Sequence, residues 1–240
     1  MKPWETLDAV DTDEGRLELR QRGERDFVIT VAGRVLMNSS WHRSEIAVAQ
    51  LACRRIARRP RPRVLIGGLG MGYTLRAALD ELPRDARVVV AEIEPAVVRW
   101  CRGPLADLTG RAVDDPRAEI ALADVARLIA EAGRSEAARF DAIVLDLYEG
   151  PRTSTQARED PFWGPAALRR TCEALTPGGV FSVWSEDPDA AFEKRLAAAG
   201  FQVERRRPES GGPRHAVYLA LTPGPSPASG RGEQSEGKKI

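Results

Sequence analysis

A cluster of glycines after an apolar segment is the part of the chain with the clearest chemical meaning. Gly68, Gly70 and Gly72 directly follow Val64–Gly67, and helical periodicity begins just beyond them. Glycine lets the backbone turn tightly and leaves the main chain open to a ligand. A helix that begins behind such a turn adds backbone N–H groups and a partial positive charge. The pattern therefore predicts a cradle for a nucleotide or nucleoside.

The spacing of these glycines narrows the class of ligand. They form G-x-G-x-G, and Tyr73 stands where the dinucleotide fingerprint G-x-G-x-x-G has its third glycine. No Gly-Lys-Ser or Gly-Lys-Thr follows, which excludes a P-loop. NAD is disfavoured by the spacing, but it is not excluded.

An acidic residue at the end of the next apolar run supports a nucleoside ligand. Glu92 ends the run Val88–Ala91 and lies 20 residues after Gly72. An acid at this place in a parallel sheet can accept hydrogen bonds from both ribose hydroxyls. The alternative is that Glu92 or Glu94 caps the next helix. Because Pro95 follows Glu94 at what would be the first helical position, the cap is assigned to Glu94 and the ligand to Glu92.

The elements that position these residues alternate between strand and helix from residue 64 onward. Short apolar runs without polar alternation are separated by segments of helical periodicity, which is typical of a parallel sheet covered on both faces. The predicted fold class is α/β, with a Rossmann-like, seven-stranded, mostly parallel sheet and helices on both faces. The first predicted strand is the apolar run 64–67 before the glycines. The other six are predicted at 88–91, 118–122, 142–145, 180–184, 201–204 and 216–221.

Smaller segments flank this sheet. Alternating residues between 15 and 37, with a polar turn at 23–26, predict a small N-terminal β-hairpin. We expect residues 1–40 to form this extension and 41–222 to form a Rossmann-like cofactor-binding catalytic domain. Residues 223–240 are rich in proline, glycine and serine, and they predict a disordered tail.

Composition gives no sign of nucleic-acid or membrane binding. The 240-residue chain has a formal net charge of +1. The arginine-rich segment 54–63 lacks aromatic residues, so it is interpreted as a helix end and solvated linker. The three cysteines of the whole chain lack C-x-x-C spacing, so we expect a reducing compartment and no bound metal. Since the first residues do not resemble a signal peptide, a cytoplasmic protein is expected.

Four segments together resemble a known family. VLIGGLGMGYT, VVVAEIEP, IALADVARLI and FDAIVLDLYEGP are similar to the spermidine synthase-like branch of the class I S-adenosylmethionine-dependent methyltransferase superfamily. The resemblance implies an adenosyl cofactor, with Glu92 on the ribose hydroxyls and Asp124 on the adenine amino group, next to Val125. For Asp124, a plain helix N-cap is the alternative. The glycines named above and Asp146 complete the expected cofactor site.

Departures from the family pattern concern the group that is transferred. The resemblance implies an acid in the glycine motif of polyamine-making members, where this chain has Gly70, and Arg43–Glu45 replaces their Tyr-His-Glu. Free backbone N–H groups near Gly70 and Gly72 favour the carboxylate of S-adenosylmethionine. We therefore expect a methyltransferase that uses S-adenosylmethionine. Aminopropyl transfer from decarboxylated S-adenosylmethionine is the first alternative, and a catalytically idle cofactor-binding protein is the second.

The acceptor is expected beyond the carboxyl ends of the fourth and fifth strands. Asp146, Tyr148 and Glu149 follow the fourth strand, and Ser185–Asp187 follow the fifth, which makes an acidic mouth. Such a mouth favours a small, cationic amine acceptor. Asp146 or Glu149 is the candidate base, and Tyr148 offers a face for a sulfonium or an ammonium. Alternatively, Tyr148 packs and Asp187 caps a helix. A homodimer is left open.

Overall fold

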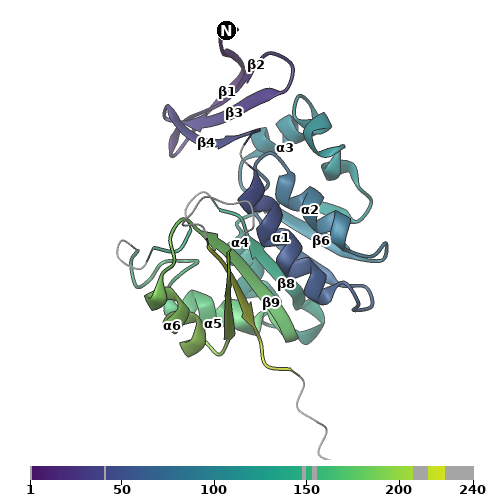
Figure 1. Cartoon of the computed structure of the whole chain (residues 1–240), viewed down its shortest axis with the longest axis vertical. Coiled ribbons are helices and arrows are strands. Elements are labelled where there is room, and N and C mark those ends of the chain that lie inside the picture. Colours follow the sequence, from purple (N-terminus) through teal and green to yellow (C-terminus); the bar gives the residue numbers. More distant parts are fainter. Residues whose placement is uncertain (1, 41, 148–149, 153–155, 208–215, 225–240) are drawn as a thin grey trace, which may run out of the picture.

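The structure contains two β-sheets, and helices cover the larger one. The computed structural model describes residues 2–40, 42–147, 150–152, 156–207 and 216–224. A four-stranded antiparallel sheet precedes a larger, seven-stranded sheet. In Figure 1 the smaller sheet lies at the top of the molecule, next to α3.

The larger sheet has the order β10-β11-β9-β8-β5-β6-β7. Strands β5 to β9 pair in parallel with one another, whereas β11 pairs antiparallel with both β9 and β10. Their bounds are β5 (Arg63–Gly67), β6 (Arg87–Glu92), β7 (Ala118–Leu122), β8 (Phe140–Leu145), β9 (Leu175–Ser185), β10 (Gln202–Arg206) and β11 (Ala216–Leu221). The predicted seven-stranded, mostly parallel sheet is confirmed. The chain runs outward from β5 in one direction and from β8 in the other, so the switch point lies between these two strands.

Helices cover both faces of the larger sheet because neighbouring residues on each strand point to opposite faces. Val64 on β5 belongs to the core under α1, α2 and α3, whereas Leu65 belongs to the core under α4, α5 and α6. The helices are α1 (Arg43–Ile56), α2 (Tyr73–Glu81), α3 (Pro95–Arg102), α4 (Val125–Ala132), α5 (Pro165–Glu173) and α6 (Ala190–Ala198). Short 3-10 helices are η1 (Ala106–Thr109), η2 (Ala112–Asp114) and η3 (Glu136–Ala138).

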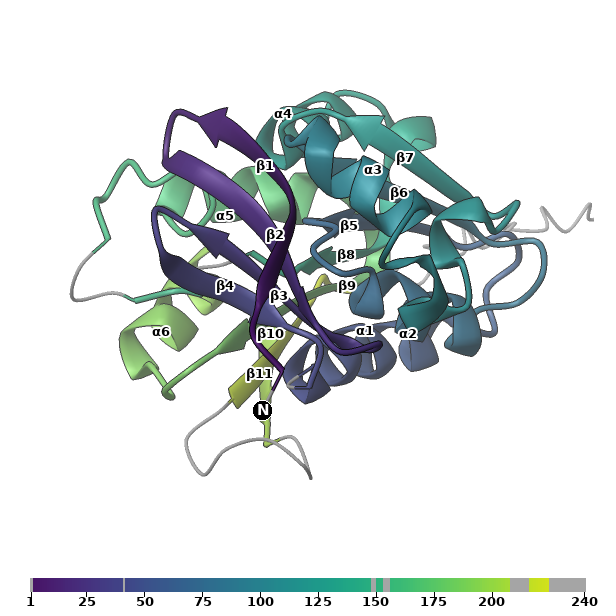
Figure 2. The same cartoon turned by 90° about the horizontal axis from the view of Figure 1, so that it is seen from above.

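The N-terminal extension is larger than the predicted hairpin. It consists of β1 (Glu5–Thr12), β2 (Gly15–Arg22), β3 (Asp26–Val31) and β4 (Arg34–Asn38). Its strands lie across one end of the larger sheet (Figure 2). On β1, the Asp8 carboxylate accepts a hydrogen bond of 2.8 Å from the Trp100 indole of α3. This bond and the shared apolar core attach the small sheet to the rest of the chain.

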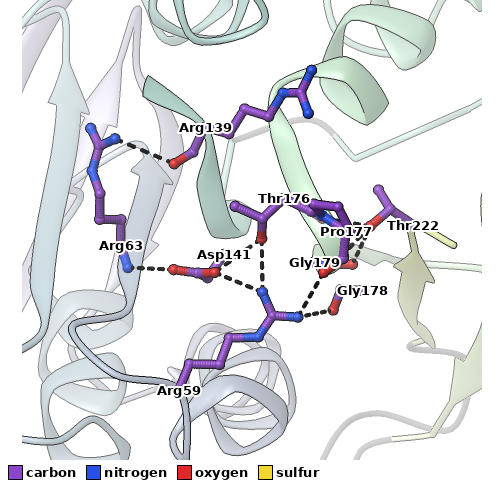
Figure 3. A network of polar contacts seen from close by, with 9 residues as sticks. All are labelled: Arg59, Arg63, Arg139, Asp141, Thr176, Pro177, Gly178, Gly179 and Thr222. Atoms are coloured by element: carbon purple, nitrogen blue, oxygen red, sulfur yellow. Dashed lines mark hydrogen bonds and ion pairs between the residues drawn. The ribbon is translucent and has the colours of Figure 1, made fainter. Parts of the chain in front are cut away.

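Arg59 joins several elements at the edge where the parallel strands begin (Figure 3). Its guanidinium donates to Asp141 at 2.7 Å and to Thr176 at 2.8 Å, at the starts of β8 and β9. Asp141 also accepts the Arg63 backbone N–H at 2.9 Å. Helix α1 ends in the arginine-rich segment as predicted. Arg59, however, does not belong to a solvated linker, because its side chain connects the starts of β8 and β9.

Within the described ranges, the structure has no helix that is long and apolar enough to span a membrane. The predicted tail begins at residue 223, and its residues 225–240 lie outside the part of the chain that the structure describes.

Candidate functional site

The glycine motif forms the turn between β5 and α2. Gly68, Gly70 and Gly72 have φ angles of 90°, 51° and 84°, a region that residues with a side chain rarely adopt. A Cβ atom on Gly68 would also come within 2.5 Å of the carbonyl oxygen of Asp146. The backbone of this turn therefore lies against the end of β8, at the switch point of the sheet.

Glu92 at the end of β6 contacts the glycine loop directly. The residue is only 8% exposed. One carboxylate oxygen accepts the Leu69 N–H at 3.0 Å, and the other accepts the Glu94 N–H at 2.9 Å. Glu94 is the N-cap residue of α3 with Pro95 at the first helical position, although its side chain makes no capping hydrogen bond. Each carboxylate oxygen can still accept a second hydrogen bond, so both remain available to ribose hydroxyls. Binding of ribose by Glu92 stays a prediction.

Asp124 and Val125 lie at the start of α4, beyond the end of β7. Asp124 is the N-cap residue, and its side chain accepts the Ala126 N–H at 2.8 Å, which is the alternative considered from the sequence. Val125 is buried, and its methyl groups leave about 3 Å for a Cβ atom at Gly67. Adenine binding by these two residues stays a prediction.

Two large apolar side chains are exposed near Glu92. Ile93 is 64% exposed and Leu122 is 59% exposed. Leu122 pairs with Glu92 across β6 and β7, so both side chains lie at the carboxyl ends of neighbouring strands. Sequence reasoning missed Ile93, although a large apolar residue between two acids was a signal. An exposed apolar surface next to a buried carboxylate suits the flat face of a base and its ribose.

Among the acids of the described residues, Asp146, directly after β8, has the pKa that departs most from its ordinary value. Burial, followed by the negative charge of Glu45, raises the pKa of Asp146 from its ordinary 3.8 to about 7. Hydrogen bonds from the Thr74 hydroxyl and from Trp184 oppose this rise. At neutral pH the carboxyl group therefore exists in both protonation states. Tyr148 and Glu149, the other predicted catalytic residues, lie outside the described residues.

Thr74 links three elements around Asp146, and the sequence did not single it out. It is 1% exposed in the first turn of α2. Its hydroxyl donates to the Asp146 carboxylate and lies 3.4 Å from the Glu45 carbonyl oxygen at the start of α1. The beginnings of α1 and α2 and the end of β8 thus meet at one point beside the glycine loop.

A hollow lies beyond the ends of β8 and β9. It has a volume of about 600 Å³, and its lining includes Pro151, Arg152 and Trp184–Ala191. Glu186 forms an ion pair with Arg152, so part of the predicted acidic mouth is neutralised. The alternative considered from the sequence, that Asp187 caps a helix, is wrong. Asp189 caps α6 instead, and its carboxylate accepts the Ala191 N–H at 2.8 Å.

The strand order, with the glycine loop at the switch point and an acid at the end of β6, matches the fold of solved spermidine synthase structures. No protein-family model matches the chain. Two similar relatives are named polyamine aminopropyltransferase. One, from Clostridium tetani, is 28% identical over 130 residues, covering 54% of this chain and 43% of the relative. The other, from Hyperthermus butylicus, is 35% identical over 140 residues, covering 56% and 46%.

Solved structures give the same picture of the fold. Spermidine synthase from Thermotoga maritima has a TM-score of 0.68 at 21% identity and covers 90% of this chain and 72% of its own. A spermidine synthase in complex with the transition-state analogue AdoDATO has a TM-score of 0.66 at 20% identity. The chain spans less than half the length of the two curated relatives.

These comparisons correct the expected activity. The prediction of a methyltransferase that uses S-adenosylmethionine is wrong, because the relatives are polyamine aminopropyltransferases. The structure also weakens a physical reason for that prediction. The Gly72 N–H, expected to be free for a carboxylate, donates to the Leu69 carbonyl at 2.8 Å. The Met71 N–H is engaged as well, by the thioether of Met37 at 3.2 Å.

Proposed function

We propose that the chain is an aminopropyltransferase that moves the aminopropyl group of decarboxylated S-adenosylmethionine to a polyamine-type acceptor such as putrescine. The observation that carries this proposal is the partly buried carboxyl group of Asp146 beside the glycine loop, with Glu45 close enough to raise its pKa. Two acids at one site favour cationic ligands, and both the donor tail and the acceptor of this reaction carry amino groups. The relatives' names support the same activity.

The nucleoside half of the donor is assigned to the residues on the other side of the glycine loop. Glu92 accepts hydrogen bonds from the ribose, Asp124 faces the adenine amino group, and Val125 lies beside it. Ile93 supplies apolar contact, since it is one of the largest exposed apolar side chains of the described structure. The glycines keep the main chain free of side chains where the donor lies.

The reaction is an in-line displacement. The neutral acceptor nitrogen attacks the aminopropyl carbon bonded to sulfur. The carbon–nitrogen bond forms as the carbon–sulfur bond breaks. The electron pair of the carbon–sulfur bond stays on sulfur, which becomes the neutral thioether of 5′-methylthioadenosine. Correct alignment of the two reactants supplies most of the acceleration.

The acceptor must lose a proton, and the acids near β8 receive it. Asp146, with a pKa raised to about 7, is a suitable base near neutral pH because it is partly ionised and still basic. Glu149 and Tyr148 follow it in sequence and are assigned to the acceptor side as a second acid and an aromatic face. The hollow bounded by Glu186 and Asp187 gives room for the remainder of the acceptor.

Product analysis tests the proposal. The 240-residue chain is incubated with putrescine and either decarboxylated or intact S-adenosylmethionine, and products are identified by mass spectrometry. We expect spermidine and 5′-methylthioadenosine from the decarboxylated donor and no methylated amine from the intact donor. Asp146→Asn is the matched variant, because it keeps the shape of the side chain but cannot accept the proton as a carboxylate.

Other outcomes have clear meanings. A methylated amine without spermidine would contradict the proposal. Nucleoside binding without turnover of any polyamine would instead support the catalytically idle alternative. Loss of spermidine formation in Asp146→Asn, with unchanged binding of 5′-methylthioadenosine, would place the defect in the transfer step.

A further inference from the structure

A methionine from the N-terminal sheet contacts the glycine loop. Met37 lies on β4, is partly buried, and its sulfur is 3.2 Å from the Met71 backbone nitrogen. The same sulfur would be 3.0 Å from a Cβ atom on Gly70. Met37 therefore occupies the space beside Gly70, and its sulfur accepts a hydrogen bond from the backbone N–H of Met71.

This contact differs from the others made by the backbone N–H groups of the loop. The Gly68 N–H donates to the Ala91 carbonyl at 2.9 Å, and the Leu69 N–H donates to the Glu92 carboxylate at 3.0 Å. Those partners are oxygen atoms at the end of β6. The partner of Met71 is a thioether, which is a weak acceptor. A carboxylate would be a much stronger partner for that N–H.

We propose that Met37 is a donor-specificity residue, which disfavours donors with an α-carboxylate by occupying the Met71 N–H and the space beside Gly70. The inference rests on the proposed function and extends it to the choice between two sulfonium donors. Intact S-adenosylmethionine carries a carboxylate that needs donors when it leaves water, whereas the decarboxylated form does not. With Met37 in place, the carboxylate finds this N–H already bonded and the adjacent space filled.

A purely structural role for Met37 makes a different prediction. If the residue only attached the N-terminal sheet, its replacement would weaken all adenosyl ligands equally. Donor selection changes the ratio of two affinities and leaves the shared nucleoside unaffected. The sheet also keeps its separate attachment through Asp8 and Trp100 in such a variant.

Competitive binding to the full chain tests the inference. Met37→Leu removes the sulfur acceptor at similar volume, and Met37→Ala also opens the space. Val35→Ala is the control, because Val35 lies on the same strand and is 55% exposed. Affinities are measured for decarboxylated S-adenosylmethionine, for S-adenosylmethionine and for 5′-methylthioadenosine, which has neither the carboxylate nor the amine.

We expect the unmodified chain to bind the decarboxylated donor at least about tenfold more tightly than the intact one, the worth of a charge-assisted hydrogen bond. Met37→Leu and Met37→Ala should reduce that ratio about tenfold, with little change for 5′-methylthioadenosine. Val35→Ala should keep the ratio.

Equal affinity of the unmodified chain for both donors would overturn the inference, even if neither Met37 variant folds. An unchanged ratio in the folded variants would overturn it too. No binding of 5′-methylthioadenosine would overturn the proposed function, and the inference with it. Normal binding of that nucleoside with an unchanged ratio removes the inference alone.

Discussion

Replacing Glu92 separates its structural role from its predicted role in binding. The carboxylate is 8% exposed and accepts the N–H groups of Leu69 and Glu94. Glu92→Ala leaves both N–H groups without this acceptor. An unsatisfied buried donor costs about 1–3 kcal/mol. Because water can reach the partly exposed Glu94, we expect a total loss of about 2–4 kcal/mol in unfolding free energy.

This loss is large enough to measure by thermal denaturation. For a chain of this size, about 1 kcal/mol corresponds to about 2–4 °C in Tm. Glu92→Ala should therefore lower Tm by about 5–15 °C. Glu92→Gln should lower Tm less, because its amide oxygen still accepts from one of the two N–H groups.

Binding of 5′-methylthioadenosine gives the second measurement. If Glu92 also accepts hydrogen bonds from the ribose, both variants lose a charge-assisted interaction of about 1.5–3 kcal/mol. Calorimetric titration should then show affinity weakened by about tenfold or more. Glu94→Gln is the matched control, because its side chain makes no capping hydrogen bond, and it should change affinity little.

The two measurements test separate claims. An unchanged Tm in Glu92→Ala would show that the carboxylate does not hold the loop. Full affinity of Glu92→Gln for 5′-methylthioadenosine would refute the ribose assignment, whatever its Tm.

Three other perturbations test different parts of the molecule. The raised pKa of Asp146, about 7, means that the folded state holds a proton that the unfolded state releases near pH 4, so this group lowers stability as pH rises to 7. The Tm of Asp146→Asn should therefore rise relative to that of the unmodified chain as pH increases from 4 to 7, and the difference should stay constant above pH 7. A difference in Tm that does not change between pH 4 and 7 would contradict this. Arg59→Ala should lower Tm by at least about 3 °C, because it removes a charged hydrogen bond to the mostly buried Asp141. Arg54→Ala, which removes a more exposed ion pair, should lower Tm by less than about 4 °C, and equal losses would argue against a special role for Arg59. A chain that ends at Gly224 should keep its Tm and its affinity for 5′-methylthioadenosine in the same two assays, because the removed segment has a composition that cannot form a core.

The larger sheet could be predicted because its signals are local. Val88–Ala91 is apolar throughout, and the glycines follow their strand without interruption. The position of Glu92 then follows from the end of its strand. The first strand of the small sheet, Glu5–Thr12, gave no such signal. Its residues are mostly polar and none of them is buried, so alternation did not mark it.

The remaining contacts depend on residues that are far apart in sequence. Arg59 reaches Asp141, 82 positions away, and Met37 reaches Met71, 34 positions away. No local pattern specifies such a pair, because its geometry is set by how separate elements pack. Thr74 was overlooked for the same reason, since its importance comes from the neighbouring ends of α1 and β8.

The error over the donor has the same physical origin and shows what determines specificity at this site. The glycine motif was interpreted as a source of free N–H groups, and such groups favour a carboxylate. In the folded chain, Glu92 and Met37 bring acceptors to the loop from two other strands. On the side of Asp146 the loop meets acids instead of bases. The N–H groups of Leu69, Met71 and Gly72 are already bonded, and acids lie nearby. Such a site favours a ligand whose tail is only cationic, because a carboxylate there would meet like charge.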